Sequence, residues 1–182
     1  MKKLLLGVTM LLVAVIANAQ TDITKFLGIP VDGTKAEMLS KLREKGFKSS
    51  YTMGADFLEG IFNGTEVYVT PVTNGNKVHR IAVIYKNPLD ETQTKAHFNR
   101  LCQQFTSNGK YQAAASKQEI PGSEDIGFEM LVNKKQYEAR FFQLPYNKNK
   151  TVWLTFKEYG YNKFLIILFY ENGYNQANGE AL

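Results

Sequence analysis

Apolar residues recur at intervals of three and four in two stretches of this chain, the spacing of an amphipathic helix with one buried face. The first stretch places Met38, Leu39 and Leu42 on one face. A capping-box sequence that begins at Thr34 precedes it, and Gly46 follows it. Because glycine accepts the left-handed conformation that ends many helices, the pattern predicts a helix between these two residues.

The second stretch is longer and runs from about Glu91 to Asn108. Its apolar residues follow the spacing i, i+3, i+4 and i+7, and they are Phe98, Leu101, Cys102 and Phe105. Asp90 is suited to cap the first turn, with Gln93 three residues later, and Asn108-Gly109 is suited to end the last turn. These signals predict a second helix, with the thiol of Cys102 on its buried face.

The remaining apolar residues fall in short segments separated by turn residues, which is the pattern of β-strands. Asn63-Gly64 is the strongest hairpin signal, because both central residues of a type I′ turn need positive φ. Seven strands are predicted, over residues 57–62, 65–71, 78–85, 128–132, 136–143, 151–157 and 164–170. The last segment is apolar at nearly every position, so we expect a central strand that is covered on both faces.

The two halves of the chain repeat one order of features: helix, strand, tight asparagine turn, strand, polar loop, strand. Residues 74–77 and 147–150 are the matching Asn-x-Asn-Lys loops. The order predicts an α+β fold in which an antiparallel sheet has helices on one face. It also predicts two tandem α-β-β-β repeats, about 26–87 and 88–171. Chance similarity of two helix-plus-hairpin stretches gives the same pattern, because turn residues recur in any antiparallel protein.

The N-terminus has the three parts of a cleavable signal peptide. Two lysines supply the positive charge, residues 4–16 form an apolar run, and Ala17-Asn18-Ala19 has the small–x–small pattern of a cleavage site. The apolar run is shorter than the roughly 20 residues that span a bilayer. We therefore expect residues 1–19 to be removed. The mature chain, residues 20–182, would be a single domain with a polar C-terminal tail, in the periplasm or secreted.

Charge and cysteine content narrow the classes of partner and chemistry. Loss of Lys2 and Lys3 with the leader lowers the net charge from +5 to +3, and the charges are scattered, so we expect no nucleic-acid partner. No second apolar run is long enough to span a membrane. Cys102 is the only cysteine, so the chain has no internal disulfide and no lipidation site after the leader. A reactive thiol or a dimer disulfide is the alternative role for Cys102, although no cationic cluster accompanies it.

The sequence contains no recognisable catalytic or metal-binding motif. The two histidines, His79 and His97, lack the close spacing of metal ligands. Neither a Gly-x-Ser-x-Gly elbow nor a phosphate-binding loop is present. We therefore assign no catalytic residue, no metal site and no cofactor.

Alternation along the predicted strands indicates one candidate binding surface, because every second side chain of a strand points to the same face. If the helices cover one face, the opposite face carries five large side chains: Tyr68, Arg80, Arg140, Phe142 and Trp153. Aromatic residues and arginine are enriched in the hot spots of protein interfaces. The alternative is structural: Phe142 and Trp153 shield the sheet as cross-strand neighbours, or lie beneath the long 110–125 loop.

The segment around the first helix resembles the opening of a known group of exported proteins. Residues 28–38 read Gly-Ile-Pro-Val-Asp-Gly-Thr-Lys-Ala-Glu-Met, followed by Leu42 and Gly46-Phe47. This is similar to the G-(x)-T-xx-E-hydrophobic-xx-L opening of helix-plus-sheet repeats, which include the outer-membrane assembly lipoprotein BamE (SmpA) and the β-lactamase inhibitory protein. The resemblance implies helix-then-strands units, and the inhibitory protein presents a concave sheet to its partner. The chain has neither the lipobox cysteine nor the cysteine pair of those proteins. It also resembles small exported proteins of gut Gram-negative anaerobes, for which no activity is implied.

Together these features favour an exported, non-enzymatic binding protein that engages a protein or a glycan through the exposed sheet face. Two other functions stay open. A hydrolase would have a dispersed site under the 110–125 loop, and a deep pocket with converging carboxylates or a histidine would indicate it. A structural subunit of envelope assembly would form a stable complex that is recovered from envelope extracts.

Overall fold

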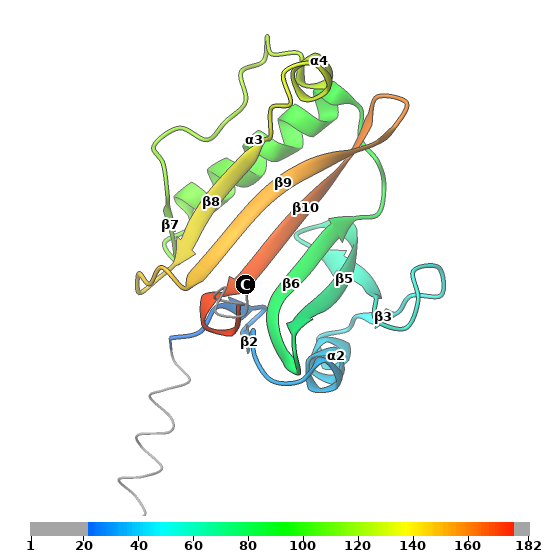
Figure 1. Ribbon diagram of the computed structural model, residues 1–182, viewed down its shortest axis with the longest axis vertical. Helices are drawn as coiled ribbons and strands as arrows, with labels where there is room; N and C mark the ends of the chain where they lie inside the picture. Colours follow the sequence, from blue (N-terminus) through cyan, green and yellow to red (C-terminus); the bar gives the residue numbers. More distant parts are fainter. Residues whose placement is uncertain (1–21, 177–182) are drawn as a thin grey trace, which may run out of the picture.

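Both predicted helices start at their expected caps in the computed structural model, which describes residues 22–176 (Figure 1). Helix α2 (Lys35–Glu44) follows Thr34, and helix α3 (Glu91–Ser107) follows Asp90. Each cap residue forms a capping box with the residue three positions later. The helices therefore begin where side chains satisfy backbone N–H groups that have no partner within the helix.

Eight strands form one antiparallel sheet with the order β3-β4-β5-β6-β10-β9-β8-β7. Their bounds are Lys48–Ser49 for β3, Leu58–Phe62 for β4, Thr65–Asn74 for β5, Lys77–Tyr85 for β6, Tyr111–Ala113 for β7, Glu138–Gln143 for β8, Lys150–Gly160 for β9 and Lys163–Asn172 for β10. A separate two-stranded hairpin, β1 (Lys25–Phe26) and β2 (Ile29–Pro30), precedes α2. Asn63 and Gly64 adopt positive φ in the β4–β5 turn, as the hairpin prediction requires. The α+β class with an antiparallel sheet is confirmed.

The strand order is the same in the two halves when it is counted from the edges of the sheet. The first half runs inward as β3-β4-β5-β6, and the second half runs inward as β7-β8-β9-β10. The last strands of the halves, β6 and β10, pair in the middle of the sheet. Each half thus has one long helix and four strands of the continuous sheet, one strand more than the predicted α-β-β-β unit. Descent of the halves from one duplicated unit stays a prediction.

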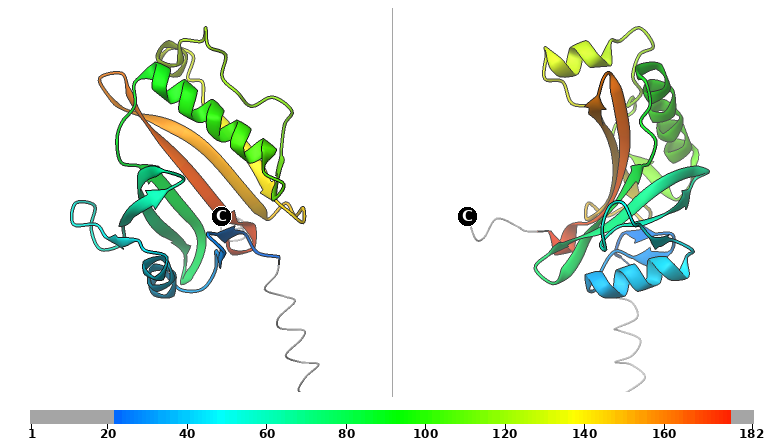
Figure 2. Two further views of the ribbon diagram at one scale, coloured as in Figure 1. Left: turned by 180° about the vertical axis from the view of Figure 1, so that it is seen from behind. Right: turned by 90° about the vertical axis from the view of Figure 1, so that its right-hand side faces the viewer.

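Helices α2 and α3 lie on the same side of the twisted sheet (Figure 2). The hydrophobic core lies between them and the sheet, and its strand residues include Val67, Val69, Ile81, Val83, Ala139, Phe141, Val152, Leu154, Ile166 and Leu168. Phe26 of β1 is fully buried on this side. Its ring lies 5.3 Å from that of Phe62 in the first half and 4.9 Å from that of Tyr170 in the second, measured between centroids. The N-terminal hairpin therefore contributes to the packing between the halves.

The strand predicted over residues 128–132 is wrong, because this segment belongs to a short helix, α4 (Ile126–Leu131). The Asp125 side chain accepts a hydrogen bond from the Phe128 backbone N–H and caps the helix. Phe128 and Leu131 are exposed, so the apolar run does not mark a buried strand. A short apolar run does not distinguish a strand from a helix by periodicity alone, and the cap decides here.

The expectation that the last strand is covered on both faces is also wrong. Strand β10 is central, and its residues alternate between buried and half-buried. Leu165, Ile167 and Phe169 are half-buried on the side of the sheet opposite α2 and α3. Their neighbours on adjacent strands shield them in part, and this explains why an apolar residue is tolerated at each position.

A 3₁₀ turn, η1 (Gly173–Asn175), follows β10 near the C-terminal end of the described residues. Asn175 fixes this turn to β6, because its Nδ2 donates to the Val78 carbonyl at 2.9 Å. No helix within residues 22–176 has the length and apolar character needed to cross a membrane. The proposed leader, residues 1–19, lies outside the described residues.

Candidate functional site

The side of the sheet opposite α2 and α3, called the open face below, presents three rows of side chains across five strands. Cross-strand pairing defines the rows as Tyr68, Ile84, Ile167, Thr155, Glu138; Thr70, Ala82, Phe169, Trp153, Arg140; and Val72, Arg80, Glu171, Thr151, Phe142. Ala82, Thr151 and Glu171 are buried, and the other members are half-buried or exposed. All five residues predicted from strand alternation belong to these rows. They therefore share one face, although they come from four strands.

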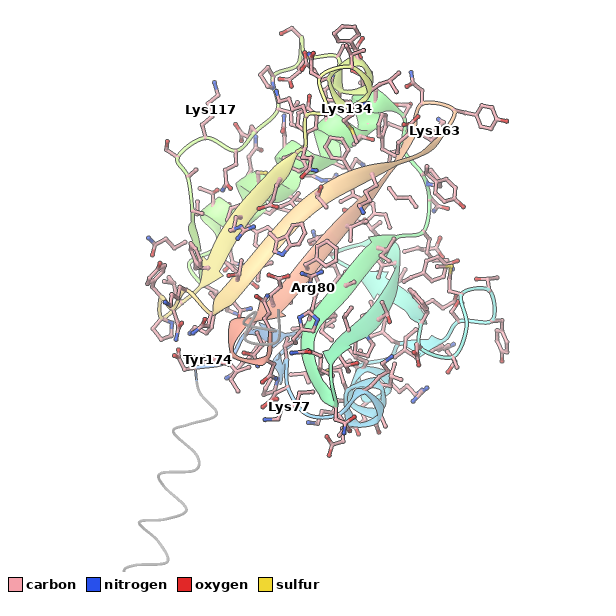
Figure 3. The ribbon with its side chains drawn as sticks, viewed as in Figure 1. Lys77, Arg80, Lys117, Lys134, Lys163 and Tyr174 are labelled. Atoms are coloured by element: carbon pink, nitrogen blue, oxygen red, sulfur yellow. The ribbon has the colours of Figure 1, made fainter. Side chains whose placement is uncertain are left out.

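Arg80 lies near the middle of the open face, between the Lys77 end and the Lys163 end (Figure 3). Its guanidinium carbon lies 4.8 Å from the Phe169 ring centroid and 5.5 Å from that of Trp153. The two rings stack on each other at 4.3 Å. Arg80 also forms an ion pair with Glu171, whose side chain is only 9% exposed. We call these four residues the Arg80 cluster, a group in which cation–π contacts and an ion pair hold a cation beside two aromatic rings.

Three buried nitrogen atoms in and beside this cluster have no hydrogen-bond partner among the described residues. They are His79 Nδ1, Arg80 Nε and Trp153 Nε1. His79 lies at an irregular point of the β5–β6 ladder, where the register shifts between Val72 and Thr73. Burial and, to a smaller extent, the neighbouring Arg80 hold the pKa of His79 below its ordinary value. Buried polar atoms without partners are uncommon in native proteins, and they gather here on one surface.

Arg140 is the cross-strand neighbour of Trp153 and extends the polar part of the face toward β8. Its side chain is 47% exposed and pairs with Glu138, with Arg140 Nε 2.9 Å from Glu138 Oε1. The pair is open to water and is therefore weak. Arg140 thus remains accessible to a partner while it lies next to the Arg80 cluster.

Tyr68 and Phe142 lie on opposite flanks of the open face, on β5 and β8. The Tyr68 hydroxyl lies 3.2 Å from Thr52 Oγ1, and the Lys86 ammonium lies 5.2 Å from the centroid of the Tyr68 ring. Phe142 packs edge-on against Tyr146 at 5.0 Å. The structure therefore brings Arg80, Trp153 and Arg140 together and leaves the other two predicted residues at the margins.

Sequence reasoning missed Phe169 and Glu171, which complete the Arg80 cluster. Phe169 belongs to a strand that is apolar on both faces, so alternation did not reveal the side to which it points. Glu171 follows the predicted end of that strand at residue 170, although β10 continues to Asn172. The sequence signal for Glu171 is its position as a lone acidic residue directly after an apolar strand.

The 110–125 loop begins with the edge strand β7, and the rest of it runs beside α3 and β8, away from the middle of the open face (Figure 1). Asn99 of α3 exchanges two 2.8 Å hydrogen bonds with the Ile120 backbone. Gln118 Oε1 accepts from the Arg140 backbone N–H at 2.6 Å, so the loop also contacts β8 beyond the β7 pairing. Its residue Glu124 forms an ion pair with Lys135, and the hydrogen bonds from Lys135 and Tyr137 hold the pKa of this carboxyl below its ordinary value.

Cys102 is buried as expected, and burial raises the pKa of its thiol to about 12. A thiol with this pKa is protonated at neutral pH and is a poor nucleophile. Within residues 22–176, no group of three or more histidine, cysteine or acidic side chains is arranged to hold a metal ion. His97 instead packs edge-on against Tyr85 at 6.0 Å.

No protein-family model, curated protein or solved structure matches this chain significantly. The chemistry of the open face is therefore the basis for a functional proposal. That chemistry combines stacked aromatic rings, a partly exposed arginine on each side of them, and buried polar atoms without partners.

Proposed function

We propose that this chain is an exported, non-enzymatic binding protein, and that the open face captures a protein or glycan partner. The observation that carries the proposal is the Arg80 cluster, with Arg140 beside it, on a sheet face that α2 and α3 leave uncovered. Such a combination of aromatic and arginine side chains is typical of interface hot spots. Half-buried Ile84 and Ile167 in the neighbouring row add apolar area around it.

The geometry of the rings favours a protein over a glycan as the partner. A sugar that stacks on an aromatic side chain needs a free ring face. The Trp153 and Phe169 rings instead occupy one face of each other at 4.3 Å, and the Arg80 guanidinium carbon lies 5.5 Å and 4.8 Å from their centroids. A protein surface contacts the edges of these rings, the arginines and the flanking isoleucines over several strands, which is the usual anatomy of an interface.

The proposed leader gives the setting in which this partner is met. Residues 1–19 have the pattern of a signal peptide, so we expect the mature chain to act in the periplasm or outside the cell. Cell-envelope or culture extracts are therefore the place to search for the partner.

The test is capture of the partner by immobilised mature protein and by two variants of the open face. Arg140→Ala and Trp153→Ala should each lower the amount of co-purified partner by roughly tenfold or more, the loss typical of a hot-spot residue. Lys117→Ala is the matched control, because Lys117 is an exposed basic residue on the 110–125 loop and lies away from the middle of the face (Figure 3). Mass spectrometry of the eluates measures the loss.

Folding and binding effects are separated by the choice of variants. Trp153 is half-buried and stacks on Phe169, so its removal affects stability as well as contact area. Arg140 is exposed, and Arg140→Ala should keep the melting temperature of the parent chain. Equal capture by the parent chain and by both variants would exclude the open face as the binding surface.

A further inference from the structure

A cavity of about 960 Å³ opens on the helix-covered side of the sheet, where the two halves meet. Its floor is formed by Leu168 and Tyr170 of β10. Apolar side chains from α3, the β1–β2 turn and the β4 strand form much of its walls: Leu27, Ile61, Phe62, Leu101 and Phe105. The volume is at the upper end of the range of small-molecule sites, about 300–1,000 Å³.

The cavity exists because each long helix covers mainly its own half. Helix α2 packs on β4, β5 and β6, whereas α3 packs on β7, β9 and β10. A side-chain hydrogen bond links the halves beside the cavity, from Asn63 Nδ2 in the β4–β5 turn to Gln104 Oε1 of α3, at 2.8 Å. The space between the halves is therefore framed by fixed elements.

The charged residues that line the cavity are both cationic. Lys25 and Lys110 contribute to its lining, and no aspartate or glutamate of the described chain does. Neither lysine forms an ion pair with another residue in the range 22–176. An anion in this cavity would meet two positive charges and no opposing negative charge.

Backbone contacts place the two lysines at the same end of the cavity. The Lys25 N–H donates to Gln143 Oε1 at 2.7 Å, and Gln143 Nε2 donates back to the Lys25 carbonyl at 2.6 Å. The Leu144 N–H donates to the Lys110 carbonyl at 2.9 Å. The consecutive residues Gln143 and Leu144 therefore hold the backbones of both lysines at this end of the cavity.

The Tyr170 hydroxyl of the floor is neutral at physiological pH. Burial raises the pKa of the Tyr170 hydroxyl well above its ordinary value, and the adjacent Tyr111 raises it further. The cavity thus combines apolar side chains with neutral amide and hydroxyl groups, such as those of Asn63, Gln104 and Ser107, and a cationic end.

From this charge complementarity and apolar lining we propose that the cavity binds a free straight-chain carboxylic acid, with its alkyl chain over Leu168 between Leu101 and Phe62. The carboxylate pairs with Lys25 and Lys110. This site lies on the opposite side of the sheet from the open face, and it is independent of the partner proposed there.

The test is displacement of a dansyl-labelled undecanoic acid from the mature protein by unlabelled acids of 8 to 16 carbons. Each added methylene should tighten binding roughly two- to fourfold until the cavity is full, because each is removed from water. The methyl ester of the best acid should bind at least about tenfold more weakly, because it lacks the charge that the lysines recognise.

Charge reversal locates the site within the molecule. Lys25→Glu and Lys110→Glu should each weaken binding of the acid by roughly tenfold or more. Lys117→Glu makes the same change of net charge at a residue that does not line the cavity, so it should leave the affinity unchanged. Trp153→Ala should also bind the acid normally, because this residue lies on the open face. Circular dichroism checks that each variant is folded.

Three results would overturn the proposal: no displacement by any acid, equal affinity for the acid and its methyl ester, or folded Lys25→Glu and Lys110→Glu variants that bind as the parent does. Loss of acid binding in Trp153→Ala with retention in both lysine variants would assign the acid to the open face instead. None of these outcomes bears on capture of a protein by the open face, so the two proposals fail separately.

Discussion

Arg80 connects the aromatic and acidic side chains at the centre of the open face. Its guanidinium lies over Phe169 and beside Trp153, and it pairs with Glu171. The Arg80 side chain is 28% exposed, so water satisfies only part of its hydrogen-bonding capacity. Glu171, the anionic partner of Arg80 among residues 22–176, therefore matters for the stability of the folded chain.

We predict that Glu171→Ala lowers the free energy of unfolding by about 1–3 kcal/mol, because it leaves a largely buried cation without its partner. Glu171→Gln should lower the free energy of unfolding by less, since glutamine keeps the shape of the side chain and one hydrogen-bond acceptor. Urea unfolding followed by circular dichroism measures both changes.

Glu138→Ala is the matched control, because Glu138 pairs with Arg140 on the same face but at a solvent-exposed position. Glu138→Ala should lower the free energy of unfolding by less than about 1 kcal/mol. If Glu171→Ala and Glu138→Ala destabilise the chain equally, the Arg80–Glu171 pair has no special role in stability.

At the scale of elements, the sequence best predicts the helix ends and turns that depend on residues close together in the chain. The two capping boxes and the Asn63-Gly64 turn are local signals, and each appears where it was expected. Helix α4 differs from the strand predicted there because its few apolar residues fit either element, and the Asp125 cap starts a helix. Strand alternation correctly predicts that the five residues share one face of the sheet. The cavity is not predictable in this way, because its lining comes from both halves of the chain and no local sequence pattern marks it.

The cap of α2 gives a prediction at this scale. Thr34 accepts a hydrogen bond from the Glu37 N–H, and the Glu37 carboxylate accepts one from the Thr34 N–H at 2.8 Å. Thr34→Ala removes the first of these bonds and should lower the free energy of unfolding by about 1 kcal/mol. Thr34→Ser keeps the hydroxyl and should lose much less. Chemical denaturation of the two variants side by side is the measurement, and equal midpoints would contradict a stabilising role for the cap.

At the scale of the whole molecule, the halves share one sheet and one core. Strands β6 and β10 pair over five residue positions, from Ile84 with Ile167 to Arg80 with Glu171. Phe26 packs against rings of both halves, and the core residues form one connected cluster. A half that opened alone would expose the β6 or β10 edge together with its apolar face.

We therefore expect the halves to unfold in one cooperative transition. Trp153 reports on the second half, and Tyr68→Trp in a Trp153→Phe background reports on the first. The urea midpoints of the two fluorescence curves should coincide with each other and with that from far-UV circular dichroism. Separate midpoints would show that the halves are independent folding units.

Strand β10 has a further consequence for how this molecule tolerates change. Leu168 and Tyr170 form the floor of the cavity, while Phe169 and Glu171 belong to the Arg80 cluster on the reverse side. A one-residue slip that moved Glu171 into the position of Tyr170 would bring its carboxylate to the cavity floor and the Tyr170 side chain to the Arg80 cluster. Insertions or deletions within these four residues would thus disturb both surfaces at once, whereas point substitutions alter one and spare the other.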